Sequence, residues 1–99
     1  MEKKFYALYL KPLRSDFAQT MTAEERNIML QHVAYWTEYM NKGMVLAFGP
    51  VMDPKEIYGL GIVAVDQEDQ LKTLIENDPA GKINRYEYYP MRAMVPVKQ

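Results

Sequence analysis

His32 is the only histidine in the chain, and it lies in the middle of the apolar face of a predicted long helix. Asp78 has a similar position, seven residues after Leu71 on the apolar face of a second predicted helix. Two ionisable groups on inward helix faces indicate a small polar site in an apolar setting, where proton chemistry tends to occur. An imidazole takes and gives a proton near neutral pH, and a carboxylate on one ring nitrogen would orient it and stabilise its charged form.

Both residues also have plain structural interpretations. His32 could be a core histidine whose two nitrogens are satisfied by a carbonyl and a tyrosine hydroxyl. Asp78 could be a turn residue, because Pro79 follows it. Their pairing meets a geometric difficulty: with both helices running in the same direction, the two side chains would lie up to about 15 Å apart along the helix axes. Contact between them is therefore a hypothesis that the structure tests directly.

Local signals place the two helices. Thr22 and Glu25 are spaced as in a capping box, and Gly43 suits the left-handed residue that ends a helix. Asp66 is expected to cap the second helix, and Pro79 to end it. The apolar positions are Ile28, Met29, Tyr35, Trp36, Tyr39 and Met40 in the first helix and Leu71, Leu74 and Ile75 in the second.

Four apolar runs are predicted to be strands, at residues 5–10, 44–48, 57–65 and 84–95. Pro12 ends the first run, and Pro90 places the last one at a sheet edge. Gly49 and Pro50 are expected to break the regularity of the second run beside a pocket. Residues 11–21 are predicted to be a long loop of the kind that often covers a site.

The order strand, helix, strand, strand, helix, strand predicts an α+β, ferredoxin-like split βαβ domain over residues 1–99. Such a domain has a four-stranded antiparallel sheet with both helices on one face. Residues 44–48 and 62–65 are apolar at consecutive positions, as in strands that are buried on both faces. The open sheet face is therefore predicted to pack against a second copy, forming a homodimer.

Composition narrows the classes of function. The net charge of −1 and the absence of long charged blocks argue against nucleic acid and membrane surfaces as partners and favour small molecules. One histidine and no cysteine leave no visible metal-ligand spacing, and no glycine-rich phosphate loop is present, so no metal or cofactor is expected. Without a signal-type region or an apolar run of about 18 residues, the chain is predicted to be cytoplasmic.

Several further side chains are candidates for the pocket. Arg14, in the predicted loop, could fold over the site and hold an anionic group, or it could simply be solvated. Aromatic walls could come from Tyr35, Trp36, Phe48 and Tyr88, although aromatic residues at helical or strand spacing usually belong to the core.

Taken together, these segments resemble the YciI-like (YCII-related) proteins. The resemblance rests on "MTAEERNIMLQHVAYW", "KGMVLAFGPVMDP", "YGLGIVAVD", "ENDP" and "YEYYPMRAM", which together span most of the chain. It implies a dimeric α/β-barrel-type assembly with a pocket on each protomer, and His32 and Asp78 match the histidine and aspartate proposed as the family's active-site pair. The chemistry associated with the family is of dehydrohalogenase or lyase type.

The leading hypothesis is a cofactor-free enzyme in which His32 removes a proton from a small cyclic or aromatic substrate, in an elimination or isomerisation. Two alternatives remain open at this point. The same pocket could belong to a non-catalytic ligand-binding or regulatory domain, or the chain could be a dimeric interaction module without a ligand.

Overall fold

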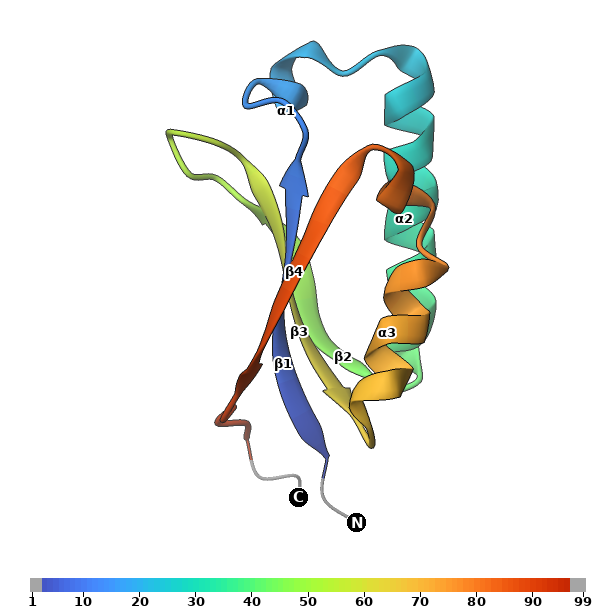
Figure 1. Cartoon of the computed structure of the whole chain (residues 1–99), viewed down its shortest axis with the longest axis vertical. Helices are drawn as coiled ribbons and strands as arrows, with labels where there is room; N and C mark the ends of the chain where they lie inside the picture. The colour runs from blue at the N-terminus through green and yellow to red at the C-terminus, as the bar shows by residue number, and fades with distance from the viewer. Residues whose placement is uncertain (1–2, 97–99) are drawn as a thin grey trace.

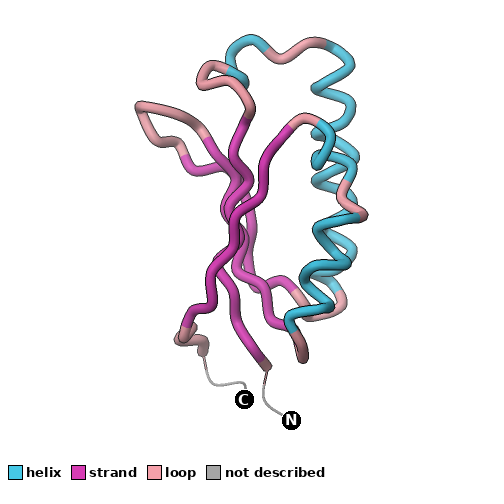
Figure 2. The backbone as a smooth tube through the Cα atoms, viewed as in Figure 1, coloured by secondary structure: helices cyan, strands magenta, loops and turns pink. Residues whose placement is uncertain are grey.

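The four strands form one antiparallel sheet in the order β2-β3-β1-β4, and the long helices cover one of its faces (Figure 1). The computed structural model describes residues 3–96. Its elements are β1 (Lys4–Pro12), α1 (Phe17–Thr20), α2 (Ala23–Asn41), β2 (Val45–Val51), β3 (Tyr58–Val65), α3 (Glu68–Glu76), the 3₁₀ helix η1 (Pro79–Lys82) and β4 (Asn84–Met91). The predicted α+β ferredoxin-like fold is confirmed, and its strand and helix layers are evident in Figure 2.

Burial alternates along β1 because its successive side chains point to opposite sheet faces. Tyr6, Leu8 and Leu10 are buried beneath the helices, whereas the residues between them lie on the open face and are only partly buried. Trp36 of α2 and Leu71 and Leu74 of α3 complete this core from the helix side. No helix within residues 3–96 is both long enough and apolar enough to cross a membrane.

Several boundaries differ from the sequence-based expectation. The last strand, predicted over residues 84–95, ends at Met91. Residues 11–21 are not one loop, because β1 continues to Pro12 and α1 forms one short turn of helix over Phe17–Thr20. Gly49 and Pro50 do not interrupt the second strand, since both lie within β2, where Pro50 is paired with Gly59. A proline is tolerated there because β2 is an edge strand and can lack an N–H donor. The irregularity in β2 falls earlier, between Val45 and Ala47.

The helix ends follow their local signals with one exception. Thr22 and Glu25 form the predicted capping box, and Gly43 has the predicted positive φ, at 86°. Asp66 does not cap the second helix: Gln67 holds that position, and Gln70 Oε1 accepts from the backbone N–H groups of both Asp66 and Gln67. The Asp66 carboxylate instead pairs with the Lys3 ammonium at 3.0 Å.

The two long helices run in opposite directions, which corrects the expectation that they are parallel. Each follows a strand of the pair β1 and β3, and those strands are antiparallel, so α2 descends and α3 ascends in Figure 1. The end of α3 therefore meets the middle of α2. His32 lies nine residues before the end of α2, and α3 is nine residues long, so Asp78 reaches the height of His32 after about 13 Å of each helix.

Candidate active site

His32 and Asp78 are in direct contact, although they are far apart in the sequence. His32 Nδ1 lies 2.8 Å from Asp78 Oδ2 and 3.1 Å from Oδ1. Asp78 Oδ2 also accepts from Trp36 Nε1–H at 2.6 Å, and Oδ1 accepts from the backbone N–H of Ala80 at 2.9 Å. The side chain of Asp78 is fully buried, so three protein donors replace water around this carboxylate.

These contacts follow from local structure on both sides. His32 and Trp36 are four residues apart on α2, so their side chains lie on one face and reach the same carboxylate. On the other side, α3 ends at Glu76, and Asp78 becomes the N-cap of η1, with Pro79 at its first position. This cap fixes the carboxylate against α2.

The contact with Asp78 determines how the imidazole is presented. A carboxylate that already accepts two N–H bonds also accepts the third, so Nδ1 of His32 carries a hydrogen. The second nitrogen, Nε2, makes no hydrogen bond to a described residue and is not sealed inside the protein. In the neutral ring, Nε2 therefore offers a lone pair, which is the arrangement of a general base.

His32 lies in the wall of a cavity of about 560 Å³ between α2 and the covered face of the sheet. This volume is in the range of small-molecule sites. Phe17 of α1 closes one part of the wall, Met52 and Ile57 of the β2–β3 connection form another, and Tyr86 adds a wall from β4. The lining is predominantly apolar, so the imidazole borders a space with few polar groups.

The cavity has room because two positions under α2 carry no side chain. Gly59 and Gly61 are opposite Leu10 and Leu8 in the β-ladder, so they lie on the covered face of the sheet. Both glycines line the cavity. A Cβ atom on Gly61 would make an ordinary contact with Phe48 Cβ at 3.5 Å, whereas one on Gly59 would press on Leu10 Cβ at 3.1 Å.

The structure places four of the sequence-predicted wall residues at the cavity and moves two others away. The four that line it are Trp36, Phe48, Gly49 and Pro50. Tyr35 instead lies against α3, where its hydroxyl donates to the Leu74 carbonyl at 2.6 Å. Burial, followed by Tyr39 and Asp78, raises the pKa of Tyr35, so this hydroxyl keeps its hydrogen. Tyr88 packs edge-on against Tyr6 and donates to Glu68 at 2.7 Å.

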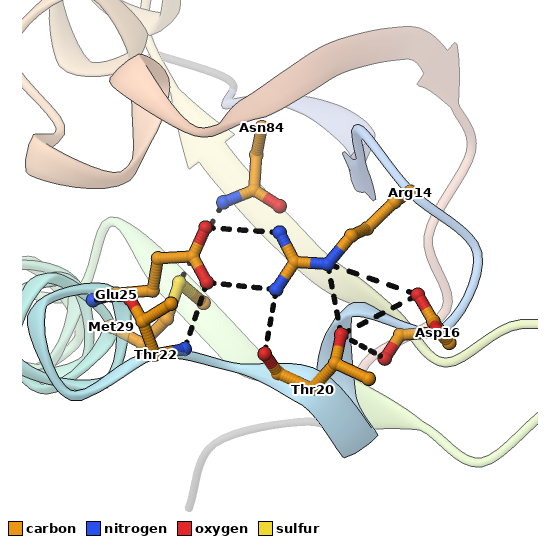
Figure 3. Close-up of polar contacts among 7 residues, drawn as sticks. All are labelled: Arg14, Asp16, Thr20, Thr22, Glu25, Met29 and Asn84. Atoms are coloured by element: carbon orange, nitrogen blue, oxygen red, sulfur yellow. Dashed lines mark hydrogen bonds and ion pairs between the residues drawn. The ribbon is translucent and has the colours of Figure 1, made fainter.

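Arg14 is not in the cavity wall, and it is not available for an anionic ligand. Its Nη1–H and Nη2–H groups donate to the two carboxylate oxygens of Glu25 at 3.0 and 2.8 Å, and Nε–H donates to Thr20 Oγ1 at 2.9 Å (Figure 3). Its guanidinium also lies over the Phe17 ring, 5.1 Å from the centroid. Arg14 thus ties the α1 segment, which covers part of the cavity, to the first turn of α2.

The ion pair of Arg14 and Glu25 should make the stability of the fold depend on pH in the acid range. The Arg14 hydrogen bond and the Thr22 backbone N–H lower the pKa of Glu25 from 4.5 to about 2. Because the pKa is lower in the folded state, the pair stabilises the fold fully above about pH 4.5 and loses this effect as the pH falls toward 2. Glu25→Gln should therefore melt below the wild type at pH 7, and the gap should close through that window. A gap that is constant from pH 7 to pH 2 would contradict the assignment.

The comparison with protein-family models places the whole architecture in one family. Residues 5–95 match the YCII-related domain. The chain belongs to this family. Its YCII-related domain includes β1 from its second residue onward, β2 to β4, both long helices, His32, Asp78 and every residue of the cavity wall. Searches of the curated proteins and of the solved structures found no match.

Parts of this YCII-related site were missed by reasoning from sequence alone. Gly59 and Gly61 were not identified as site residues from the sequence, although their spacing of two places both on one sheet face. Asn84 carried no signal, because its place in the wall depends on how β4 and η1 meet. Within residues 3–96, no three His, Asp or Glu side chains are grouped as they would be to hold a metal ion.

Proposed function

We propose that this YCII-related domain is a cytoplasmic enzyme in which His32 acts as a general base on a small cyclic or aromatic substrate. The observation that carries the proposal is the position of the imidazole. Nδ1 is held by the buried Asp78, and His32 lies in the wall of a cavity large enough for a small molecule. A base that is oriented on one side and open on the other needs no cofactor to remove a proton.

The roles of the two residues follow from their contacts. When Nε2 takes a proton from the substrate, His32 becomes an imidazolium, and the negative charge of Asp78 stabilises it across 2.8 Å. Trp36 and Ala80 hold the carboxylate in place through their own N–H groups, so it does not need to reorganise during the step. Loss of the proton then drives the elimination of a leaving group or the movement of a double bond.

Replacement of His32 by alanine tests this role. Small ring compounds with an acidic C–H group are incubated with the protein in D₂O, and NMR follows the incorporation of deuterium. His32→Ala should reduce exchange by about 10²- to 10⁴-fold, the usual contribution of a positioned base, and should weaken substrate binding by no more than about tenfold, the contribution of one hydrogen bond. An equal loss of affinity and exchange would instead favour the second candidate, a non-catalytic domain that binds a ligand in the same cavity.

We also propose that the domain forms a homodimer through the open sheet face. Ile62 is opposite Ala7 on β1 and Ala47 on β2, so an apolar band crosses three neighbouring strands. Tyr89 continues this band on β4 and is more than half exposed. An exposed apolar band of this kind is typical of an interface.

A charge in the middle of this band should separate the two copies. Ile62→Lys is expected to convert a dimer to a monomer, as measured by light scattering coupled to size-exclusion chromatography, because an interface charge would be buried without a partner. Gln31→Lys, on the exposed side of α2, is the matched control and should remain dimeric. A monomeric wild type would refute the proposal.

A further inference from the structure

The charge of the cavity wall restricts the ligand. Among the described residues, none of the lining side chains belongs to Asp, Glu, Lys or Arg. Arg14 is the only Lys or Arg in residues 13–21, the segment that contains α1 and covers part of the cavity. Its guanidinium makes two hydrogen bonds to the carboxylate of Glu25, which balances its charge. A carboxylate or phosphate entering this space would lose its water without gaining a counter-ion, which is strongly unfavourable. The cavity is therefore suited to an uncharged molecule.

The polar side-chain atoms available to such a molecule are acceptors. The first is Nε2 of His32, which offers a lone pair in the neutral ring, where the hydrogen is on Nδ1 and is donated to Asp78. The second is Oδ1 of Asn84. Its amide nitrogen donates to the Ala80 carbonyl at 3.2 Å and lies 3.6 Å from Met29 Sδ, and Oδ1 has no partner among the described residues and is not sealed from solvent.

These two acceptors are neighbours, and no donor side chain accompanies them. Met29 and His32 are three residues apart on one face of α2, so Asn84, which contacts Met29, lies about one helical turn from the imidazole. Two hydroxyl groups belong to lining residues, but neither serves the cavity. The Tyr86 hydroxyl is enclosed by protein, and the Tyr58 ring stacks with Tyr9 on the open face of the sheet.

We infer that the ligand of this cavity is an uncharged, largely apolar compound that carries a hydroxyl group beside the acidic C–H group required for proton transfer, and that this hydroxyl donates a hydrogen bond to Asn84 Oδ1 or His32 Nε2. This inference rests on the proposed use of the cavity as the substrate site, and it specifies the chemical class of the substrate. A ketone of the same skeleton only accepts hydrogen bonds, so it would place an acceptor against two acceptors and leave them unpaired. Such a mismatch lowers the affinity by roughly a factor of 10 or more, which corresponds to about 1.4 kcal/mol or more.

Three compounds of matched size test the inference on the wild-type protein: adamantanol, adamantanone and adamantanecarboxylate. Their dissociation constants are measured by calorimetry. Occupancy is followed by the fluorescence of Trp36, the only tryptophan of the chain and part of the cavity wall. We expect the alcohol to bind at least about tenfold more tightly than either the ketone or the carboxylate. A smaller preference, a preference for either of the other two, or no binding of any of them would overturn the inference.

A pair of glycine variants locates the binding. Gly61→Val adds a side chain on the cavity side of β3, and its Cβ is in ordinary contact range of Phe48, so the fold should survive, as circular dichroism would verify. It should weaken alcohol and ketone binding by at least about tenfold. Gly81→Ala, at an exposed position with open space around it, should change neither. Unchanged binding in Gly61→Val would place the ligand elsewhere and overturn the inference.

The preference for a hydroxyl-bearing ligand and the catalytic role of His32 can be refuted independently of each other. Binding of the three compounds involves no turnover, so an alcohol preference can stand even if His32→Ala leaves deuterium exchange unaffected, in which case the general-base proposal alone fails. Conversely, His32-dependent exchange on substrates that carry a carboxylate would retain the base and refute the alcohol as ligand.

Discussion

Replacing Asp78 with alanine should lower the free energy of unfolding by about 3–5 kcal/mol, the range for removing one partner of a buried charged contact. The carboxylate is fully buried and accepts from His32, Trp36 and the backbone of Ala80, so its removal leaves three inward-facing donors unpaired. It also removes the N-cap of η1. Urea unfolding followed by Trp36 fluorescence measures the effect, which is a large fraction of the stability of a small domain.

Asp53 provides the matched control. Its carboxylate likewise accepts from a backbone N–H two residues ahead, that of Lys55 at 2.9 Å, but in a solvent-exposed turn. Water can replace that hydrogen bond, so Asp53→Ala should cost less than about 1 kcal/mol. Similar losses for the two alanine variants would show that the buried contacts with α2 contribute little to stability.

Asp78→Asn should slow the proposed proton transfer by a factor on the order of 10⁴, by analogy with the loss of the orienting carboxylate in a serine protease triad. The amide has nearly the same size, but it carries no charge to stabilise the imidazolium of His32. It also presents an NH₂ group to one of the three donors that now share the carboxylate. The expected kinetic signature is a fall in kcat with KM changed by less than about threefold.

Tyr35→Phe separates this effect from a general loosening of the helices. The Tyr35 hydroxyl donates to the Leu74 carbonyl and so joins α2 to α3 without touching Asp78. Its loss should destabilise the fold by about 1 kcal/mol and leave kcat unchanged. If Tyr35→Phe reduced kcat as much as Asp78→Asn, the carboxylate would be acting through structure alone.

The order of the elements and most of their boundaries are local properties of this chain. The capping box of Thr22 and Glu25 and the positive φ of Gly43 each depend on residues within a few positions, and both predictions are confirmed. The edge position of Pro90 is also confirmed, because β4 lies at one end of the sheet. The failure at Pro50 has a long-range origin. Pro50 was expected to break a strand, but whether a strand tolerates proline depends on its having a free edge, which only the sheet order determines.

The candidate site was likewise predictable in part from the sequence and in part only from the tertiary structure. The sequence by itself placed His32 on the apolar face of α2, because helical periodicity is a short-range signal. The expectation that Asp78 lies on a helix face was wrong, because α3 ends at Glu76 and Asp78 is the N-cap of η1. Whether they meet was decided by tertiary structure: β1 and β3 are antiparallel, so α2 and α3 run in opposite directions and the end of one reaches the middle of the other.

Tertiary packing also determined the size of the cavity and the absence of an available charged side chain beside it. Gly59 and Gly61 leave space only because their sheet face lies under α2, and Arg14 is unavailable to an anion only because folding brings Glu25 within 2.8 Å. Local sequence thus determined which residues were able to do chemistry. Long-range packing determined which of them share one space, because that depends on strand order and helix direction rather than on neighbours in the chain.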